Sequence, residues 1–467
     1  MRKIFIETVG CPKNQEDSEK MAGLLKKAGH VISLQPEEAD VIIINTCGFI
    51  EDAKRESIEA FFDYVPYKEL GKRLILTGCL TQRYPDELAA ELHEADAILG
   101  VNDYEKLPGI ISRHNGHSEA IQEEKVPVYV QGNPGILAAE RAALSSRHSS
   151  YLKIAEGCSN RCAYCIIPEI RGPYRSVPEE QLLEEAGVLS SEGCKELILI
   201  AQDLTAYGID LYGKYALSGL LKALCESEKI SGIEWFRFLY CYEERITDEL
   251  IRVMADEQRI LKYMDIPLQH VNDRILKNMR RSSSKDNIRR TITNLREAVP
   301  GIVLRTTFIT GLPGETEQDF EELYEFVSET RFDRLGVFAY SPEEGTDAAV
   351  MPDQVDREIA EARRDSLMRL QQQISLEKNL ALIGTVQDVI VDGFDSDVSA
   401  SKTSGDCEGN IYVGRTRADA PEIDNAVIFE ASPIDDIIGR IVQVRITDAL
   451  DYDLVGVYAK DFSHEFA

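Results

Sequence analysis

Short apolar runs rich in β-branched residues alternate with helical patterns over most of this 467-residue chain, and this alternation restricts the fold more than any other feature. A strand that is followed by a helix and then by another strand forms a parallel sheet with helices on its faces. Near the C-terminus the pattern changes to short strands separated by turns. The sequence therefore predicts an α/β protein with three parts.

Residues 1–140 contain four apolar runs, KIFIETVG, DVIIINTCG, RLILTGC and AILG. Helical patterns lie between them at 15–28, 50–64 and 83–93. This arrangement predicts an open parallel α/β domain. Asp17 and Ser18 stand near the start of the first helical pattern, where residues of this kind cap helices.

Residues 141–375 contain six strand candidates, YLKIAEG, KELILIAQD, WFRFLY, YMDIP, VLRTTFITG and RLGVFAY, with helical patterns between them. Six successive βα units predict a barrel-like parallel sheet that is incomplete, a (β/α)6 barrel. The chemistry of such barrels sits at the carboxyl ends of the strands. The preceding stretch 132–150 is interpreted as an interdomain connection.

A charged helix at about 353–381 leads into the third part, residues 376–467. Its short runs, TVQDVIVDGF, NIYVGRT, AVIFEA, RIVQVRIT and DLVGVYA, predict a small all-β unit, an open barrel.

The N-terminus MRKIFIETVG has no apolar signal core, and no apolar run reaches the length of about 18 residues that a membrane span needs. We expect a cytoplasmic protein with no membrane partner.

In that compartment, clustered cysteines indicate metal binding or catalysis more often than disulfides. Ten cysteines are present; four of them show no spacing pattern and are interpreted as buried apolar side chains: Cys194, Cys225, Cys241 and Cys407.

Three cysteines, Cys158, Cys162 and Cys165, stand on one short loop directly after the first barrel strand. Thiolates bind zinc or iron–sulfur clusters, and a [4Fe–4S] cluster needs four ligands. Three local cysteines leave one iron open. A structural zinc site would need a fourth protein ligand, and the next histidine downstream is His270.

Cys11, Cys47 and Cys79 each follow a predicted strand of the first part. Ligands of open α/β sheets bind outside the carboxyl ends of the strands. We therefore expect these three thiols to converge on one point, in contrast to three unrelated buried thiols.

The CxxxCxxC loop, with the aromatic Tyr164 before its last cysteine, resembles that of the radical S-adenosylmethionine (SAM) enzymes. The resemblance implies a [4Fe–4S] cluster whose open iron binds SAM and whose electron cleaves it to a 5′-deoxyadenosyl radical. Other stretches are similar to the SAM-facing strands of that family. The residues implied to contact SAM are Tyr164, Gln202, Asp203, Arg305, Thr307 and Gly311.

Over its full length the chain is similar to the methylthiotransferases within that family, which join a three-cysteine domain, a radical-SAM barrel and a TRAM β-domain. This resemblance implies a second [4Fe–4S] cluster on Cys11, Cys47 and Cys79 that presents sulfur to the substrate. An electron donor is implied as a partner. A second SAM would supply the methyl group.

Three segments, GCPKNQEDS, NTCGFI and IPLQH, resemble the branch that thiomethylates the β-carbon of an aspartate in small-subunit ribosomal protein S-twelve. The other branch modifies transfer RNA adenosine and typically has Gln-Met in place of Pro12-Lys13. A third alternative is a non-catalytic iron–sulfur electron carrier, which would have no need of a barrel.

The charge of each part of the chain bears on the choice between a ribosomal protein and transfer RNA as the substrate. The net charge is −29 overall, and it is −9 for 1–140, −9 for 141–375 and −11 for the much shorter 376–467. A domain that binds RNA phosphates should be basic. The acidic C-terminal part favours a basic ribosomal protein over RNA as the direct substrate, although acidity can also serve solubility alone.

Four polar residues near these motifs have two interpretations each. His270 contacts the substrate or is a structural histidine. Lys13 steers an anionic sulfur species or is solvated. Arg280 and Arg281 form surface or interdomain ion pairs or contact the substrate carboxylate.

Overall fold

Six parallel strands form the N-terminal sheet in the computed structural model, which describes residues 1–113, 125–137, 139–144, 147–394, 410–432 and 436–460. The strand order is β2-β1-β3-β4-β5-β6. The strands are β1 Lys3–Thr8, β2 Val31–Ile32, β3 Val41–Thr46, β4 Arg73–Gly78, β5 Ala97–Leu99 and β6 Val128–Tyr129. Every residue of β3 is buried, as expected for a central parallel strand with helices on both faces. This confirms the predicted open parallel domain.

The helices of this sheet differ from the prediction in three ways: the first begins earlier, the third is divided into α3 and α4, and α5 was not predicted. They are α1 Pro12–Lys27, α2 Glu51–Tyr64, α3 Cys79–Arg83, α4 Pro85–Glu91 and α5 Leu107–Ser112. α1 has Cys11 as its N-cap and Pro12 in its first turn, where the fixed φ of proline favours a helix start. Asp17 and Ser18 therefore lie inside the helix, fully buried, and the capping role predicted for them was wrong.

Two three-stranded parallel sheets make up the central barrel, in the orders β11-β10-β7 and β12-β13-β14. One isolated bridge, Phe236 to Ile260, links them. The strands are β7 Ser149–Lys153, β10 Glu196–Ile200, β11 Trp235–Phe238, β12 Tyr263–Gln269, β13 Val303–Thr310 and β14 Arg334–Ala339, and a two-stranded ribbon of β8 Ala155–Glu156 and β9 Arg175–Ser176 lies beside them. The predicted incomplete (β/α)6 barrel is confirmed.

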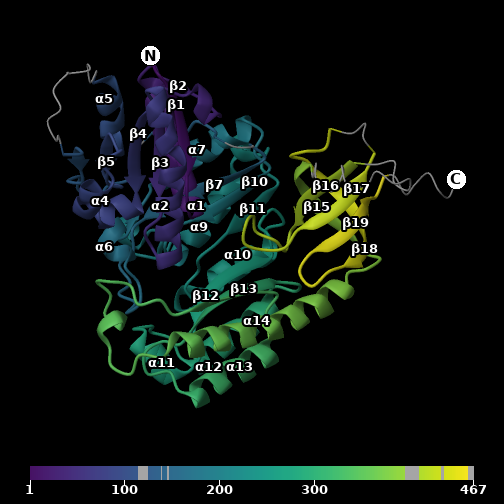
Figure 1. The fold of residues 1–467 in the computed structure, drawn as a ribbon. Coiled ribbons are helices and arrows are strands. Elements are labelled where there is room, and N and C mark those ends of the chain that lie inside the picture. Colours follow the sequence, from purple (N-terminus) through teal and green to yellow (C-terminus); the bar gives the residue numbers. More distant parts are fainter. Residues whose placement is uncertain (114–124, 138, 145–146, 395–409, 433–435, 461–467) are drawn as a thin grey trace, which may run out of the picture.

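Helices cover the outside of this barrel (Figure 1). They are α7 Glu179–Ser191, α9 Leu217–Glu226, α10 Asp248–Asp256, α11 Asp273–Asn278, α12 Lys285–Ala298 and α13 Glu317–Thr330. Two short helices lie elsewhere: α6 Ile167–Arg171 contacts α3 of the N-terminal part, and α8 Ile209–Tyr212 contacts β9. The N-terminal sheet stands beside β7 and β10, so that α1 lies between the two parts of the molecule and contacts β7.

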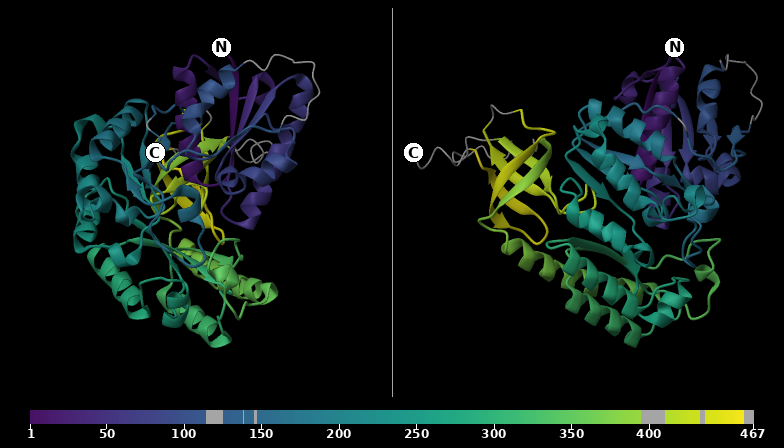
Figure 2. Two further views of the ribbon diagram at one scale, coloured as in Figure 1. Left: turned by 90° about the vertical axis from the view of Figure 1, so that its left-hand side faces the viewer. Right: turned by 180° about the vertical axis from the view of Figure 1, so that it is seen from behind.

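The long helix α14, Arg357–Leu380, runs along the central barrel to the C-terminal β-unit (Figures 1 and 2). That unit is a barrel of β15 Val386–Phe394, β16 Asn410–Thr416, β17 Val427–Ala431, β18 Ile441–Ala449 and β19 Leu454–Tyr458. It is closed rather than open, because β17 pairs with β19 and β15 pairs with β18. Among the described residues, no helix, α14 included, combines the length and apolar character needed to cross a membrane.

Buried ion pairs attach the C-terminal barrel to the starts of the central strands. Glu196 Oε1 accepts a hydrogen bond from Arg237 Nε and Glu196 Oε2 accepts one from Arg415 Nη1, each at 2.8 Å. The loop after β16 adds two more pairs, Arg334 with Asp419 and Arg305 with Asp424. Part of the C-terminal acidity that the sequence suggested for a partner is therefore paired inside the molecule.

Replacing Glu196 by alanine is expected to lower the free energy of unfolding by about 3–5 kcal/mol, because Arg237 and Arg415 would remain buried without their shared carboxylate. Urea unfolding of the full chain measures the change. The matched control is Glu234→Ala, which removes an exposed carboxylate 2.9 Å from Lys195 and should cost less than about 1 kcal/mol. Equal effects of the two substitutions would contradict a structural role for the Glu196 junction.

Candidate functional site

The first cysteine triad lies at the carboxyl ends of three adjacent strands. Cys11 follows β1, Cys47 follows β3 and Cys79 follows β4, and these strands are neighbours in the sheet. Gly10 brings two of the loops together: its φ is +97°, and a Cβ there would lie 2.6 Å from the Cβ of Cys47 and 3.0 Å from its Sγ. The three thiols thus lie together at the carboxyl end of the sheet.

The protonation of these thiols reflects that proximity. Burial, together with the charges of Cys79 and Cys11, raises the pKa of Cys47 to about 12. Burial also raises the pKa of Cys79, while Arg171 opposes the rise. Thiols that hold one another in the neutral form become thiolates when a bound cation supplies positive charge.

The second triad stands on the loop between β8 and α6. Backbone hydrogen bonds fix this loop from two sides: Ala163 N donates to Met279 O at 3.0 Å, and Ala348 N donates to Ala163 O at 2.8 Å. Burial, with a smaller contribution from the neighbouring thiols, raises the pKa of Cys158 to about 11 and that of Cys165 to about 12.

In the described part of the chain, no group of three or more His, Cys, Asp or Glu side chains is placed to hold a single metal ion. An iron–sulfur cube makes a different demand, because each of its cysteine ligands binds a different iron. Each set of three soft sulfur donors matches the three cysteine ligands of a cluster with one open iron.

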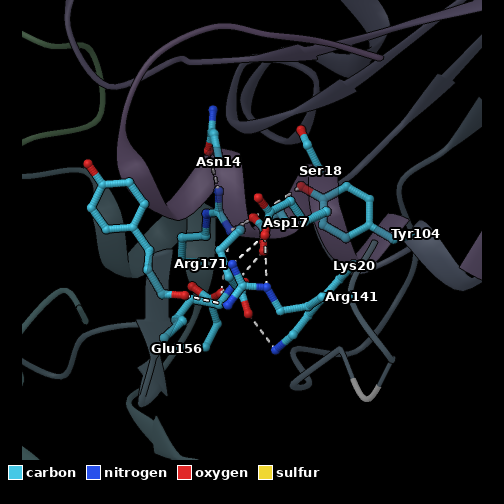
Figure 3. Close-up of polar contacts among 12 residues, drawn as sticks. Asn14, Asp17, Ser18, Lys20, Tyr104, Arg141, Glu156 and Arg171 are labelled. Carbon is cyan, nitrogen blue, oxygen red and sulfur yellow. Dashed lines mark hydrogen bonds and ion pairs between the residues drawn. The ribbon is translucent and has the colours of Figure 1, made fainter. Parts of the chain in front are cut away.

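Arg171 connects the two triads. It stands six residues after Cys165, at the end of α6, and is 3% exposed. Its guanidinium donates to Cys79 Sγ from two nitrogens, at 3.1 and 3.3 Å, and to Asn14 Oδ1 at 2.8 Å. It also pairs with Asp17 at 2.6 Å and Glu156 at 3.4 Å (Figure 3). A side chain from the barrel thus helps to hold the N-terminal triad.

A buried ion-pair network extends this contact along α1. Lys153 of β7 pairs with Glu16 at 3.0 Å, with Glu156 at 2.7 Å and with Asp17. Lys20 pairs with Glu16 at 2.5 Å. The strongly polar α1 is buried because its charged side chains meet opposite charges on the barrel.

The connection between the two domains belongs to the same network. Arg141 pairs with Glu19 of α1 and, at 3.3 Å, with Glu185 of α7. It is shown beside Lys20 in Figure 3. The stretch interpreted as a simple linker therefore contributes a buried cation to the junction.

Lys13, two residues after Cys11, and Cys162 contact the same short segment after β11. Lys13 Nζ lies 3.3 Å from the centroid of the Tyr240 ring, just beyond β11. Two residues later, Tyr242 Oη lies 3.7 Å from Cys162 Sγ. The Arg281 guanidinium packs over the Tyr242 ring at 4.1 Å. The two triads therefore face a common junction between the domains.

Two of the residues expected to contact SAM lie at the end of β10. Gln202 Nε2 donates to Glu156 Oε1 at 2.8 Å, and its buried Oε1 has no partner in the described residues. Asp203 accepts a hydrogen bond from Asn160 at 2.8 Å and pairs with Arg245. Asp203 thus connects the cysteine loop to the barrel through hydrogen bonds. The Oε1 atom of Gln202 remains available to accept a hydrogen bond.

Three others lie on or after β13. Arg305 is paired with Asp265 at 2.9 Å and donates to Thr307 Oγ1 at 3.4 Å. Gly311 has a φ of +77°, and a Cβ there would lie 2.2 Å from Ala360 Cβ, so its missing side chain lets α14 approach. The sixth residue, Tyr164, packs beside Ala163 in a small apolar cluster under the cysteine loop.

The histidine and arginine alternatives are resolved by burial. His270 is fully buried; its Nδ1 accepts from Asn272 N at 3.0 Å and its Nε2 lies 3.8 Å from Glu315. Its Nε2 makes no hydrogen bond in the described residues, and its complete burial favours the structural interpretation. Arg280 is half exposed and pairs with Asp347, whereas Arg281 is buried against the cysteine loop.

A groove of about 770 Å³ lies at the opposite end of the central strands. It is lined by Lys262 and Val303, which stand at the starts of β12 and β13, and by Arg417 beyond β16. Because both triads lie at the carboxyl ends, this groove is separate from the candidate site.

Arg171, Lys153 and Glu156 were missed by sequence reasoning. Arg171 did leave one signal, a single charge between the apolar Ile170 and Gly172 directly after the cysteine loop. Its partners stand some 150 residues earlier, at Asn14 and Asp17, and only the fold brings them together.

Three family matches cover the chain. Residues 3–100 match a family described as uncharacterized protein family UPF0004, residues 152–327 match the radical SAM superfamily, and residues 383–458 match the TRAM domain. Membership of the radical SAM superfamily implies a [4Fe–4S] cluster and SAM as cofactors.

Full-length relatives decide the narrower family. "Ribosomal protein uS12 methylthiotransferase RimO" of Pelobacter propionicus is 45% identical over 97% of this chain and 97% of its own. The protein of the same name from Lachnoclostridium phytofermentans is 46% identical over 97% of this chain and 99% of its own. The chain belongs to the RimO family. Family membership covers all three parts of the molecule, from the first triad to the C-terminal barrel.

Solved structures support the fold. The radical SAM methyltransferase TsrM from Kitasatospora setae superposes with a TM-score of 0.56 at 12% identity, over 87% of this chain and 79% of that chain. At this identity the likeness concerns the fold alone.

Acid should destabilise the fold through His270. Burial lowers its pKa to about 4, so between pH 6.5 and 4 the unfolded chain binds the proton first. Stability is then present above pH 6.5 and falls by about 3 kcal/mol as the pH drops through 4. His270→Asn keeps an acceptor for Asn272 N and should flatten this slope in urea unfolding of the cluster-free protein. The exposed His93→Asn is the control, and equal slopes for wild type and His270→Asn would contradict the assignment.

Arg171→Met is expected to weaken iron binding by the N-terminal triad, because Cys79 loses two donors and Asp17 and Glu156 lose a cation. The measurement is iron per chain after anaerobic reconstitution, in a background where Cys158, Cys162 and Cys165 are alanine. That background should bind about four irons per chain, and Arg171→Met clearly fewer. Arg161→Met, at an exposed position of the cysteine loop, is the control. Unchanged iron in Arg171→Met would refute the supporting role.

Proposed function

We propose that this chain transfers a methylthio group to the β-carbon of an aspartate in ribosomal protein uS12 by radical SAM chemistry. The observation that carries the proposal is the 45% identity over 97% of the chain to relatives named as uS12 methylthiotransferases. The two cysteine triads that face one junction give this reaction a physical site.

In this proposal Cys158, Cys162 and Cys165 hold the [4Fe–4S] cluster that binds SAM, and Cys11, Cys47 and Cys79 hold a second one. When bound, the first cluster supplies the electron that cleaves SAM and the second supplies an iron that holds sulfur. Tyr164, Gln202, Thr307 and Gly311 are proposed to contact SAM, with the free Oε1 of Gln202 as the available acceptor. Asp203 and Arg305 are also proposed to contact SAM, while they keep their ion pairs with Arg245 and Asp265.

The chain's own contribution is positional. The substrate carbon would lose hydrogen at one triad and gain sulfur at the other. Both triads must therefore lie close to the same bound carbon. Arg171 and Lys153 fix α1, and with it the N-terminal triad, against the barrel that carries the second triad. The buried junction also keeps water from the reactive carbon.

A ribosomal substrate implies a cytoplasmic location and a strongly basic partner, with an electron donor as a further partner. The transfer RNA alternative is not favoured, because the full-length relatives are named for uS12. Only the unpaired carboxylates of the C-terminal barrel are available to bind a basic protein. Three others are paired within the molecule, Asp392 with Arg415, Asp419 with Arg334 and Asp424 with Arg305.

The test is mass spectrometry of uS12 and of transfer RNA after incubation with the reconstituted protein, SAM and a reductant. The expected product is a methylthio group on one aspartate of uS12, located by fragmentation. Cys158→Ala should abolish 5′-deoxyadenosine formation, whereas Cys11→Ala should stop methylthiolation while 5′-deoxyadenosine still forms. Cys225→Ala, outside both triads, is the matched control.

Methylthiolation of RNA and not of uS12 would overturn the proposed substrate. Loss of 5′-deoxyadenosine formation in both triad variants, with folding intact by circular dichroism, would overturn the proposed division of roles.

A further inference from the structure

Lys13 is a buried cation without an ion-pair partner. It stands in the first turn of α1 and is 8% exposed. Within the described residues, its Nζ has no hydrogen bond and no carboxylate within ion-pair distance; its contact is the Tyr240 ring at 3.3 Å. Lys20, Lys153 and Arg171, which are equally buried, each pair with at least one carboxylate.

The carboxylates whose charges act on Lys13, Asp265 and Glu156, are already engaged. Asp265 accepts hydrogen bonds from Arg305 Nη1 and from Tyr240 N, each at 2.9 Å. Glu156 is bound by Lys153, Arg171 and Gln202. The Lys13 ammonium therefore has no carboxylate of its own, and Cys11 is the other acidic group whose charge acts on it. A buried charge without a partner is costly, which points to an anionic ligand.

The start of α1 adds to this positive potential. The first turn of a helix carries partial positive charge and commonly contains Asp or Glu, but that of α1 contains neither. The helix is 16 residues long, so its dipole is fully developed. The buried, unpartnered Lys13 and the helix end together form a site for one anionic group.

The position of this site identifies the anion. Lys13 is two residues from Cys11, and Tyr240 is two residues from Tyr242, whose Oη lies 3.7 Å from Cys162 Sγ. The ammonium thus stands at the junction that both triads face. In an aspartate, the β-carbon is bonded directly to the carboxyl carbon, so a cation that binds the carboxylate fixes the reacting carbon one bond away.

Resting on the function proposed above, we propose that Lys13 binds the side-chain carboxylate of the substrate aspartate. Tyr240 holds the ammonium while the site is empty. An ammonium–carboxylate hydrogen bond is stronger than an ammonium–ring contact, so the substrate can displace the ring. Lys13 is then a specificity-determining residue that selects aspartate over a neutral side chain.

The test compares two peptides that carry the uS12 target sequence, one with the aspartate and one with asparagine in its place. Binding to the full-length, cluster-reconstituted protein is measured by fluorescence anisotropy without reductant. Wild type should prefer the aspartate peptide by about tenfold or more, as expected for a charge-assisted hydrogen bond. Lys13→Met should bind both peptides with similar affinity, and Lys13→Arg should keep the preference.

Lys27→Met is the matched control, because it removes a lysine from the exposed end of the same helix and should keep the wild-type preference. If Lys13→Met retains the tenfold preference while wild type methylthiolates the aspartate peptide, the role of Lys13 is refuted and the proposed function stands. If wild type methylthiolates neither peptide nor uS12, the proposed function itself fails.

Two other roles for the charge give different results. A counter-ion of the N-terminal cluster would make Lys13→Met lose iron while cluster-free wild type and variant bind the peptides alike; that outcome refutes the proposal. A site for an anionic sulfur species would make methylthiolation by Lys13→Met depend more steeply on added sulfide, with the peptide preference unchanged; that outcome refutes it as well.

Discussion

The buried pairing of Asp17 with Lys153 and Arg171 is the interaction on which the arrangement of the site depends. Asp17 belongs to the N-terminal domain, and both cations belong to the barrel. Buried ion pairs contribute little net stability compared with apolar packing, but breaking one is costly. Their value here is geometric, because they allow only one placement of α1 on the barrel.

That placement sets the positions of the chemical groups. The start of α1 carries Cys11 and Lys13, and α6 carries Arg171, which reaches Cys79. The cysteine loop and α6 are continuous in sequence, so the network that holds α1 also holds the second triad. One set of charges thus aligns two triads that belong to different domains.

Much of the fold could be predicted because apolar periodicity is local. All six barrel strands and the five C-terminal strands were predicted, and the three N-terminal cysteines were expected to converge from the ends of three different strands. The closed C-terminal barrel was not predicted, since its closure depends on pairing between β17 and β19 and between β15 and β18. The start of α1 was placed too late, because a polar first turn looks like a loop until its buried partners are known.

Charge was the least predictable property. The acidic C-terminal part suggested a surface for a basic partner. Three of its carboxylates nevertheless form ion pairs with arginines of the molecule itself: Asp392, Asp419 and Asp424. Conversely, Lys13 looked as if it could be solvated and is buried without a carboxylate. Net charge counts residues, whereas recognition depends on which charges remain unpaired after folding.

We propose that both triads serve one substrate position across the junction formed by α1, α6 and the end of β11. Electron paramagnetic resonance of the protein with both proposed clusters reduced is the test of this arrangement. The claim predicts a spectrum broadened by magnetic interaction between the clusters, which the summed spectra of Cys11→Ala and Cys158→Ala proteins do not reproduce. A spectrum equal to that sum would show two clusters too far apart to share a substrate carbon, and would contradict the claim.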